Sequence, residues 1–404
     1  MQLRQKLVLD YYLGTLLHVL LKPLVVLLGK VLRRDHDLSK CSSVTVIKML
    51  GGGSLVIAYP ALLGIKRVPH IRTLRLLTTP AVRPFAEALG IFDEVIVIRD
   101  NSLLTSFTDA IAAIVKLFHC EAIVDLEIHS RFTTVFSLFT CAVNRIGFYT
   151  RTSYWRKPLS SHLLFCNAFS GIYYFYDQIA ELLGATIPDF DQCRSQFRSA
   201  IGDTGTEQRD GERLSIALAP CCSDLATERM LTHEEWVEVL GRRLERESGA
   251  RKVQVTLLGA PGDRTSLDRL AELIGRQFPC VQSVNLAGKT RLMESIQQIA
   301  RSDELFCIDS ALLHFGRLLG IRTVSFWGPT DPVSLLRPWT NLPEEVHYTR
   351  LPCSPCVHIA DEPPCMGNNV CMRLSVHPES PEGRNPRWLV PIGAVERFSR
   401  TSDE

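Results

Sequence analysis

The 404-residue sequence has almost no excess charge of either sign, since 45 Lys and Arg stand against 43 Asp and Glu, a formal +2. A chain this close to neutral has no overall field to attract nucleic acid, which argues against a role in binding DNA or RNA. The composition, 46% hydrophobic and 22% charged, is that of a folded globular protein. The length exceeds what one core usually holds, so we expect two domains.

Other signatures are also missing. Residues 1–34 lack the layout of a secretory signal, and the 13 cysteines are odd in number and mostly isolated. This argues against a disulfide scaffold and predicts a reducing, cytoplasmic setting. The glycines at 51–53 lack the third glycine and the later acid of a dinucleotide-binding loop, and no Gly-Lys-Ser/Thr phosphate loop occurs. A dehydrogenase or an ATPase is therefore disfavoured.

The N-terminal segment is rich in Leu and Val between residues 7 and 32. Its longest charge-free run, Tyr11 to Leu21, is shorter than the roughly 20 residues that a membrane-spanning helix needs. Residues 1–34 hold six Lys or Arg and one acid, Asp10. We therefore expect residues 1–40 to form an amphipathic pair of helices in the interface of an anionic membrane. The alternative is a helix docked on the protein's own body.

Apolar strands alternate with helical stretches from residue 44 onward, which predicts an α/β fold with parallel sheets covered on both faces. We expect one Rossmann-like domain over residues 41–200 and a second over 201–345, followed by a Pro/Cys-rich appendage and closing helix over 346–404. Residues 185–213 are expected to interrupt this alternation, with an exposed linker over residues 201–213. The predicted strands are Val44–Met49, Thr73–Leu77, Val95–Ile98, Ala122–Leu126, Arg145–Phe148, Leu214–Pro220, Gln254–Leu258, Leu305–Asp309 and Thr323–Trp327.

The most informative strand ends lie in the second series. Ligands of such sheets bind beyond the carboxyl ends of the strands. One strand ends in Asp309-Ser310, where we expect Asp309 to cap a helix and Ser310 to hold an anion or a sugar hydroxyl. His314 follows one turn later and can donate to a phosphate. The alternatives are an ordinary helix cap and a buried core histidine.

These motifs resemble those of the family 9 glycosyltransferases, typified by bacterial heptosyltransferases of lipopolysaccharide core assembly. The family's Asp-Ser/Thr-Gly-x-x-His element corresponds to Asp309–His314, with Ala311 in place of Gly. Its Gly-Pro-Thr-Asp-Pro turn stands at Gly328–Pro332, and its Leu-Ala-Gly-Lys-Thr stretch at Leu286–Thr290. The resemblance spans roughly residues 44–339. It implies the GT-B fold, two Rossmann-like domains facing a cleft, with the donor in the second and the acceptor in the first.

The resemblance also implies an activity. The protein would be an inverting, metal-independent glycosyltransferase that moves a heptose-like sugar from a nucleotide-diphosphate sugar to a lipid-linked or polysaccharide acceptor, at the inner face of a bacterial membrane. Arg229 takes the place of the family's phosphate-binding Lys. The implied donor-binding residues are Ser223, Arg229, Lys289, Asp309, Ser310, His314, Gly328, Thr330 and Asp331. A catalytically silent scaffold that binds a nucleotide-sugar or partners, and a sugar-nucleotide epimerase, are the alternatives.

The family's base is missing, because Ser54 stands where its Asp is expected, and a lone Ser is a poor general base. Asp125 and Glu127 offer a substitute, since residues two apart in a strand point the same way. We expect Glu127 to be the base, with Asp125 and Ser54 as further catalytic candidates. The alternative is a capped turn that starts the next helix. Predicted acceptor-binding residues are Gly53, His129 and Arg131.

Four cysteines near the C-terminus lie within 19 residues: Cys353, Cys356, Cys365 and Cys371. Four thiolates at this density suit a structural zinc ion, with His358 as a spare ligand. Only the first two form a Cys-x-x-Cys pair, so free thiols or local disulfides are the alternatives.

Overall fold

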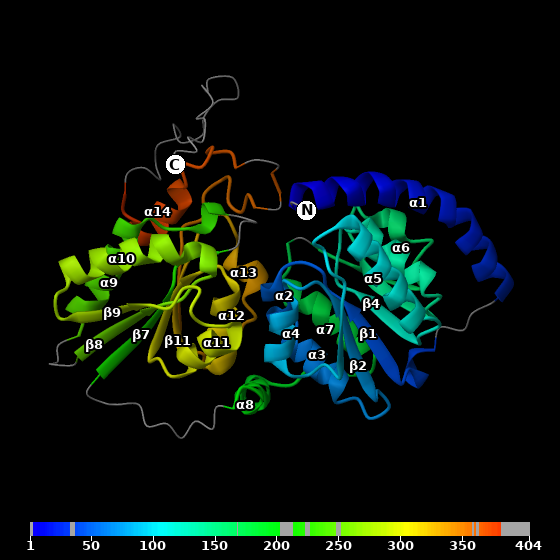
Figure 1. The fold of residues 1–404 in the computed structure, drawn as a ribbon, viewed down its shortest axis with the longest axis horizontal. Helices are drawn as coiled ribbons and strands as arrows, with labels where there is room; N and C mark the ends of the chain where they lie inside the picture. The colour runs from blue at the N-terminus through cyan, green and yellow to red at the C-terminus, as the bar shows by residue number, and fades with distance from the viewer. Residues whose placement is uncertain are drawn as a thin grey trace. The chain divides into compact units, whose positions relative to one another are not determined.

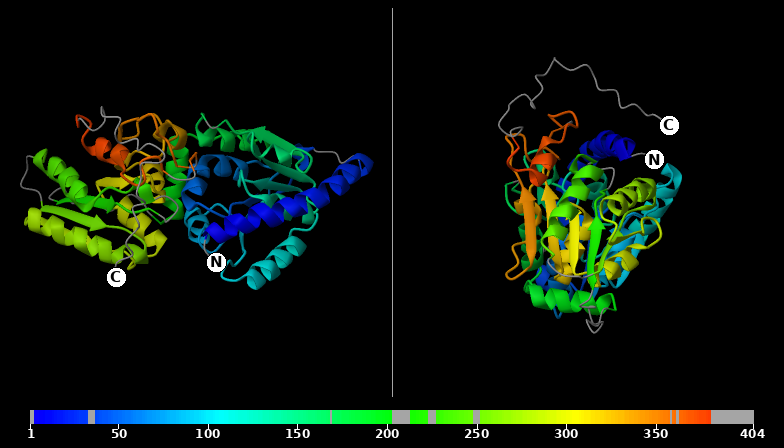
Figure 2. Two further views of the ribbon diagram at one scale, coloured as in Figure 1. Left: turned by 90° about the horizontal axis from the view of Figure 1, so that it is seen from above. Right: turned by 90° about the vertical axis from the view of Figure 1, so that its left-hand side faces the viewer.

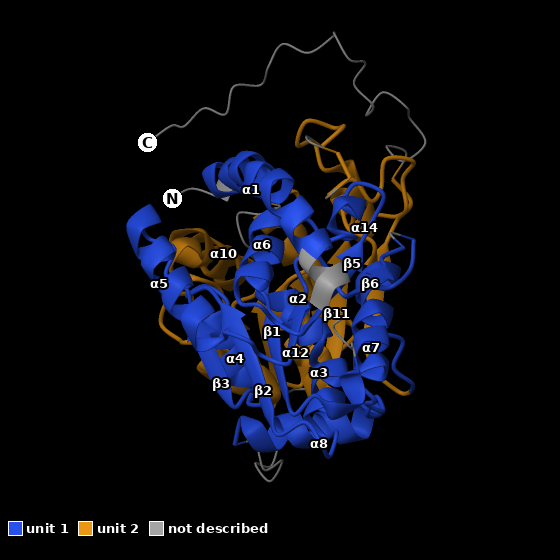
Figure 3. Ribbon diagram, turned by 90° about the vertical axis from the view of Figure 1, so that its right-hand side faces the viewer, with its two compact units in different colours: residues 1–204, 333–340 blue, residues 205–332, 341–404 orange. Residues whose placement is uncertain are grey.

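The structure is a computed structural model that describes residues 3–32, 37–167, 169–202, 213–222, 227–247, 252–357, 359–360 and 363–380. The chain divides into two compact units (Figure 3). Unit 1 comprises residues 1–204 and 333–340, and unit 2 comprises residues 205–332 and 341–404. Ser223 and His358 fall outside the described residues, as does the closing helix expected at residues 392–399.

Unit 1 contains a six-stranded sheet in the order β3-β2-β1-β4-β5-β6. All its neighbouring strands are parallel, in the strand order of a Rossmann fold. The strands are β1 Ser43–Ile47, β2 Thr73–Thr78, β3 Glu94–Val97, β4 Ala122–Asp125, β5 Asn144–Tyr149 and β6 His162–Phe165. Its helices are α1 Leu3–Leu32, α2 Gly52–Ile57, α3 Tyr59–Lys66, α4 Arg83–Leu89, α5 Leu103–Lys116, α6 Arg131–Phe139, α7 Ile172–Leu182 and α8 Phe190–Ala200 (Figure 1).

One face of this sheet is covered by α5 and α6. Ile47, Leu77 and Ile123 project from neighbouring strands and pack against Ala113 of α5 and Phe136 of α6. A capping box starts α5, because the Ser102 hydroxyl accepts from the Thr105 N–H and the Thr105 hydroxyl accepts from the Ser102 N–H.

Unit 2 repeats the architecture with the sheet order β12-β11-β10-β7-β8-β9, again parallel throughout. The strands are β7 Arg213–Ala219, β8 Lys252–Leu257, β9 Val281–Asn285, β10 Glu304–Ile308, β11 Arg322–Trp327 and β12 Glu344–Tyr348. The helices of unit 2 are α9 His233–Glu245, α10 Arg264–Gln277, α11 Leu292–Ala300, α12 Ala311–Leu319 and α14 Val370–Val376, with short 3-10 turns such as η3 Thr227–Arg229. The short helix α13, Pro332–Leu335, begins at the end of unit 2 and continues into the 333–340 segment of unit 1.

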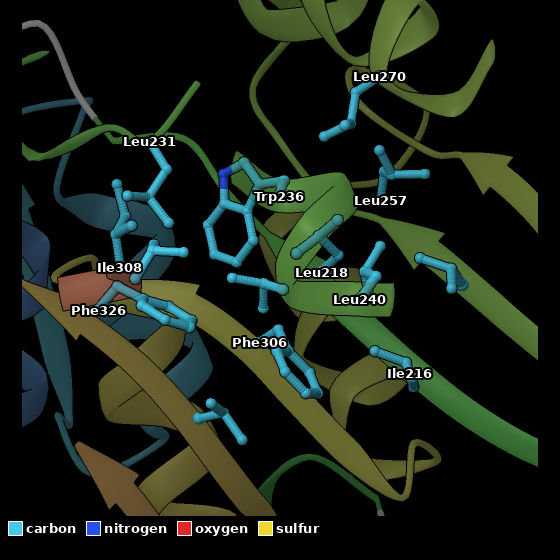
Figure 4. Packing of buried hydrophobic residues seen from close by; sticks show 14 of the residues in the cluster. Ile216, Leu218, Leu231, Trp236, Leu240, Leu257, Leu270, Phe306, Ile308 and Phe326 are labelled. Atoms are coloured by element: carbon cyan, nitrogen blue, oxygen red, sulfur yellow. The ribbon is translucent and has the colours of Figure 1, made fainter. Parts of the chain in front are cut away.

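The core of unit 2 is built around Trp236 of α9 (Figure 4). Its ring meets Phe326 of β11 edge to face, with 5.5 Å between centroids. Leu231 and Ile308 belong to the same buried cluster, just before α9 and at the end of β10. This packing fixes the loop after β7 against the carboxyl ends of β10 and β11.

Three expectations from the sequence are corrected by the fold. The segment expected to interrupt the alternation contains a helix, α8, which Asp189 caps and whose Phe197 is fully buried. The segment after residue 346 is not only an appendage, since α14 packs into the unit 2 core through Met372 and Leu374. The N-terminal segment is one helix, α1, rather than a pair. Pro23 lies inside α1 and has no N–H to donate within the helix. The helix nevertheless continues on both sides of it, from Leu3 to Leu32.

Candidate functional site

The strand order creates one switch point in each sheet. In unit 2 this point lies between β7 and β10, and in unit 1 between β1 and β4. The connections after these neighbouring strands run toward opposite sides of the sheet. The carboxyl end of such a switch point is where open α/β sheets bind ligands. Residues of a ligand site are therefore expected at the carboxyl ends of these strands.

Arg229 and Asp309 meet at the switch point of unit 2. Arg229 ends the short turn η3 that follows β7, and Asp309 follows β10 directly. The Arg229 guanidinium donates to the Asp309 carboxylate at 3.1 Å and to its main-chain carbonyl at 2.9 Å. The two side chains are 15% and 7% exposed. A cation whose position is fixed by a carboxylate is thus placed at the expected edge of the sheet.

Two buried hydroxyls lie at the ends of the same strands. Ser310, rather than Asp309 as expected, is the N-cap of α12, yet its side chain makes no capping hydrogen bond. The hydroxyl oxygens of Ser310 and Thr330 are buried without a hydrogen-bond partner among the described residues. Buried polar atoms are seldom left unpaired in a folded protein, because each one costs free energy. Both hydroxyls are therefore suited to a ligand that supplies the missing partner.

His314 lies one turn into α12, with its Nε2 atom 4.0 Å from an Asp309 oxygen. Burial lowers the pKa of His314 to about 4, and the nearby Asp309 carboxylate opposes the shift only in part. At neutral pH the ring is therefore uncharged, with one nitrogen that donates and one that accepts. The neutral His314 ring can donate one hydrogen bond to a ligand, whereas Arg229 supplies a positive charge.

The other predicted donor-binding residues have more varied surroundings. The Lys289 ammonium donates to the carbonyl of Asn285, at the end of β9, at 2.8 Å. Gly328 packs beneath α14, where a side chain would come within 2.8 Å of the Cys371 and Met372 sulfurs, so packing alone explains the glycine. Asp331 is partly exposed beyond β11.

Glu127 lies at the switch point of unit 1. Its Oε1 atom accepts from the Lys48 ammonium at 3.1 Å and from the main-chain N–H groups of Met49 and Leu50 at 2.7 and 2.9 Å. Within the described part of the chain, Oε2 makes no hydrogen bond. The side chain is 14% exposed. One oxygen is thus held by the loop after β1, and the other remains able to accept a proton.

Asp125 does not share this environment. The strand β4 ends at Asp125, so the expectation that it and Glu127 sit in one strand is wrong. The Asp125 carboxylate accepts from Thr133 at 2.8 Å and from the buried Arg156 guanidinium at 3.0 Å. Burial raises the pKa of Asp125 to about 6, although Arg156 opposes the rise. Its contacts are those of an interior ion pair that holds the strand end.

Ser54 lies in α2, and its hydroxyl donates to the carbonyl of Gly51 at 2.7 Å. Gly51 is the N-cap of α2 and has φ +73, a left-handed conformation that glycine adopts more readily than other residues. The Tyr176 phenol of α7 is close enough to Ser54 and Glu127 for both to act on its pKa, which Ser54 lowers and the Glu127 charge raises. Burial, its largest cause, raises the pKa of Tyr176 above its usual value. Ser54, Tyr176 and Glu127 therefore form one cluster.

Lys48, Arg156 and Tyr176 were missed by the sequence analysis. Lys48 directly follows the apolar strand β1, so the strand-end rule applied elsewhere would have selected it. Arg156 and Tyr176 come from η2, Tyr154–Arg156, and from α7, and no local pattern marks them.

The predicted acceptor-binding residues follow the neighbouring strands β1 and β4. Gly53 lies in the first turn of α2, and His129 is exposed in the loop after β4. The Arg131 guanidinium stacks over the rings of Tyr11 and Trp155, 4.5 and 5.1 Å from their centroids. Arg131 thus binds α1 to the body of unit 1.

The zinc interpretation of the C-terminal cysteines is not supported. Among the described residues, no three Cys, His, Asp or Glu side chains come together in an arrangement that could hold a metal ion. Cys353, Cys356, Cys365 and Cys371 are all free thiols. Burial raises the pKa of Cys371 to about 12, since its sulfur projects from α14 against Gly328.

Comparison with known families places these features in context. Residues 183–366 match the model of glycosyltransferase family 9 (heptosyltransferase). This range includes Arg229, Ser310 and Thr330. No curated protein sequence matches the chain significantly.

Solved structures are similar over most of the chain. A glycosyl transferase family 9 protein from Veillonella parvula superposes with a TM-score of 0.58 at 15% identity, over 77% of this chain and 87% of that one. The E. coli ADP-heptose lps heptosyltransferase II gives 0.57 at 16% identity, over 84% and 100%. E. coli heptosyltransferase WaaC with ADP-2-deoxy-2-fluoro heptose gives 0.56 at 15% identity, over 77% and 93%. At this identity the likeness shows the fold, which is GT-B.

Proposed function

We propose, on the premise that residues 183–366 carry a family 9 glycosyltransferase domain, that the protein transfers a sugar from a nucleotide-diphosphate donor to a hydroxyl of a glycan acceptor. The reaction would invert the anomeric configuration and need no metal ion. The transferred sugar would be heptose-like, and the acceptor lipid-linked or polysaccharide, in lipopolysaccharide-type envelope synthesis. The similar E. coli enzymes named above support this choice.

One observation carries the proposal. The unpaired buried hydroxyls of Ser310 and Thr330 lie at the carboxyl ends of adjacent strands, and Arg229 is fixed at the end of the same β10 strand. An anionic ligand with several oxygens satisfies the cation and both hydroxyls together. A diphosphate that carries a sugar has this chemistry.

The donor diphosphate is the leaving group, so the residues around it must stabilise developing negative charge. Arg229 would supply a permanent positive charge, and the free N–H groups at the start of α12 would add main-chain donors. Neutral His314 would donate one hydrogen bond to a phosphate or to the sugar. Ser310 and Thr330 would fix the orientation of the donor.

Glu127 would act on the acceptor. Its Oε2 atom takes the proton of the acceptor hydroxyl while the acceptor oxygen attacks the anomeric carbon from the face opposite the diphosphate. The bond between that carbon and the diphosphate oxygen breaks, and its electron pair leaves with the nucleoside diphosphate. Lys48 and the two N–H groups on Oε1 would hold the carboxylate in place during this step.

Product analysis tests the proposal and separates it from its alternatives. The purified protein is incubated with candidate nucleotide-diphosphate sugars, with and without an amphiphilic glycan acceptor, and the products are identified by mass spectrometry and NMR. We expect nucleoside diphosphate and an elongated acceptor with inverted configuration, formed only when acceptor is present. An isomerised sugar nucleotide without acceptor would instead indicate an epimerase. Donor binding without any product would indicate a silent scaffold.

A further inference from the structure

The helix α5 exposes an apolar stripe to solvent. Leu104, Phe107, Ile111 and Val115 are 73%, 64%, 46% and 70% exposed, and Phe118, just beyond the helix, is 62% exposed. Spacings of three and four residues place them along one side of the helix. The buried residue of α5 is Ala113. A surface helix of a soluble protein normally presents polar residues to solvent, whereas α5 presents large apolar residues to solvent.

The helix α1 exposes a second apolar face. Tyr12, Leu16, Val19 and Leu20 are 70%, 55%, 60% and 64% exposed, and they lie in the stretch Gln5–Leu27. That stretch is long and apolar enough to cross a membrane by length and composition, contrary to our expectation from its charge-free run.

The opposite face of α1 is attached to unit 1. The Asp10 carboxylate accepts from the Ser130 hydroxyl at 2.8 Å and from the N–H groups of Arg131 and Phe132 at 3.0 and 2.7 Å, which caps α6. Gly14 packs directly against Arg131, with no room for a side chain. The His18 ring meets Trp155 edge to face at 5.1 Å. To span a bilayer, α1 would have to abandon all these contacts.

The two helices that carry these apolar faces are neighbours in unit 1. The helices α1 and α5 both pack against α6, and they run near each other in the two views of Figure 2 and in Figure 3. An ion pair between Lys6 of α1 and Asp100, just before α5, joins them.

We propose that the outward faces of α1 and α5, defined by Tyr12, Leu16, Leu20, Leu104, Phe107 and Val115, form one surface that binds an anionic lipid bilayer. The helix α1 lies along the bilayer plane and does not cross it. This α1–α5 surface inserts its apolar side chains to the depth of the headgroup boundary, as interfacial helices do.

Charge complementarity selects this occupant over a second protein. Residues 1–34 carry six Lys or Arg and one acid. That acid, Asp10, is engaged with the N-terminus of α6, and one of the six basic residues, Lys6, is paired with Asp100. The other five are Arg4, Lys22, Lys30, Arg33 and Arg34. A broad apolar face beside a basic segment matches a membrane whose surface is negative. The inference concerns only the binding of lipid and does not depend on the catalytic residues. It extends the proposed function by naming the surface that would hold the enzyme beside an amphiphilic acceptor.

Vesicle flotation of the full chain tests the inference. Vesicles of phosphatidylcholine alone are compared with vesicles of equal parts phosphatidylcholine and phosphatidylglycerol. We expect the protein to float with the anionic vesicles and to be released by alkaline carbonate. The double variant Leu104→Asp, Phe107→Asp is expected to lower partitioning about ten-fold or more, because two apolar anchors are replaced by charges. Leu16→Asp, Leu20→Asp is expected to do the same.

A matched control replaces two exposed apolar residues elsewhere, Phe169→Asp and Ile359→Asp, which are 96% and 74% exposed. It should float like the unaltered protein, and unchanged circular dichroism should show that all variants fold.

Equal flotation of the α5 variant and the control would overturn the proposal, as would retention of the protein on the vesicles after carbonate. Conversion of a dimer to a monomer by the α5 variant, with vesicle binding unchanged, would assign the surface to a second copy instead. If a variant no longer floats but still transfers sugar to a soluble acceptor, the catalytic proposal is unaffected. The membrane proposal and the catalytic proposal can therefore fail separately.

Discussion

Replacing Glu127 with Gln is expected to lower the turnover number of sugar transfer by a factor of about 10²–10⁴, the usual contribution of a general base. The amide keeps an oxygen for the N–H groups of Met49 and Leu50, so the loop after β1 should stay in place. It cannot take up the acceptor proton. Nucleotide-sugar binding, measured by calorimetry, should be unchanged, because the donor residues belong to unit 2.

Glu121→Gln is the matched control. Glu121 lies just before the amino end of β4, and its carboxylate accepts from the N–H groups of Ser42 and Ser43 at the start of β1. It therefore links the two strands much as Glu127 does, at the opposite edge of the sheet. If Glu127 only held β1 to β4, both variants would lose similar stability and retain similar turnover. That outcome would remove Glu127 from the mechanism.

Replacing Arg156 with Met is expected to destabilise the protein by about 3–5 kcal/mol at pH 8, because it leaves a buried carboxylate without its partner. The Arg156 and Asp125 side chains are 1% and 7% exposed. Arg156 also donates to the carbonyls of Ser130 and Phe148, which lose those bonds. Denaturant unfolding followed by circular dichroism measures the change.

The pH dependence identifies the carboxylate as the cause. In the folded protein the pKa of Asp125 is raised from 3.8 to about 6, so the folded state binds more protons than the unfolded state between these values. This group's contribution to stability is present at low pH and falls as the pH rises through about 6. Without Arg156 the folded pKa should rise further, so the loss continues above pH 6. The deficit of Arg156→Met should therefore grow from pH 6 to pH 8. Adding Asp125→Asn should recover part of it, and a deficit independent of pH would contradict the assignment.

Central parts of the fold were predictable because a buried parallel strand is a continuous apolar run. The missed strands, β6, β9 and β12, are all at sheet edges. In β12, Glu344 and Glu345 begin the strand, and in β9, Gln282 and Ser283 interrupt it, since an edge strand is covered less completely than a central one. A search for apolar runs cannot find β9 and β12, whereas β6, with Leu163, Leu164 and Phe165, is an apolar run that such a search could have found.

The candidate site was predictable where chemistry follows a strand directly. Asp309, Ser310 and Thr330 lie at strand ends in both the sequence and the structure, because parallel strands bring their carboxyl ends to one edge. Asp125 shows the limit of this rule. Its partner Arg156 comes from a turn 31 residues later, and only the tertiary fold decides that the carboxylate is paired in the interior.

The most direct test of the central claim, a nucleotide-diphosphate site at the β7–β10 edge, is ligand-induced thermal stabilisation. A panel of nucleoside diphosphates and nucleotide sugars is compared on the unaltered protein, on Arg229→Ala and on Arg243→Ala. Arg243 is the matched control, because it pairs with Glu304 at the amino end of β10, at 2.8 Å. A ligand at 100 times its dissociation constant should add about 2.7 kcal/mol to the free energy of unfolding. We predict a selective shift that Arg243→Ala keeps and Arg229→Ala loses. No shift with any nucleotide, or equal shifts in both variants, would contradict the account.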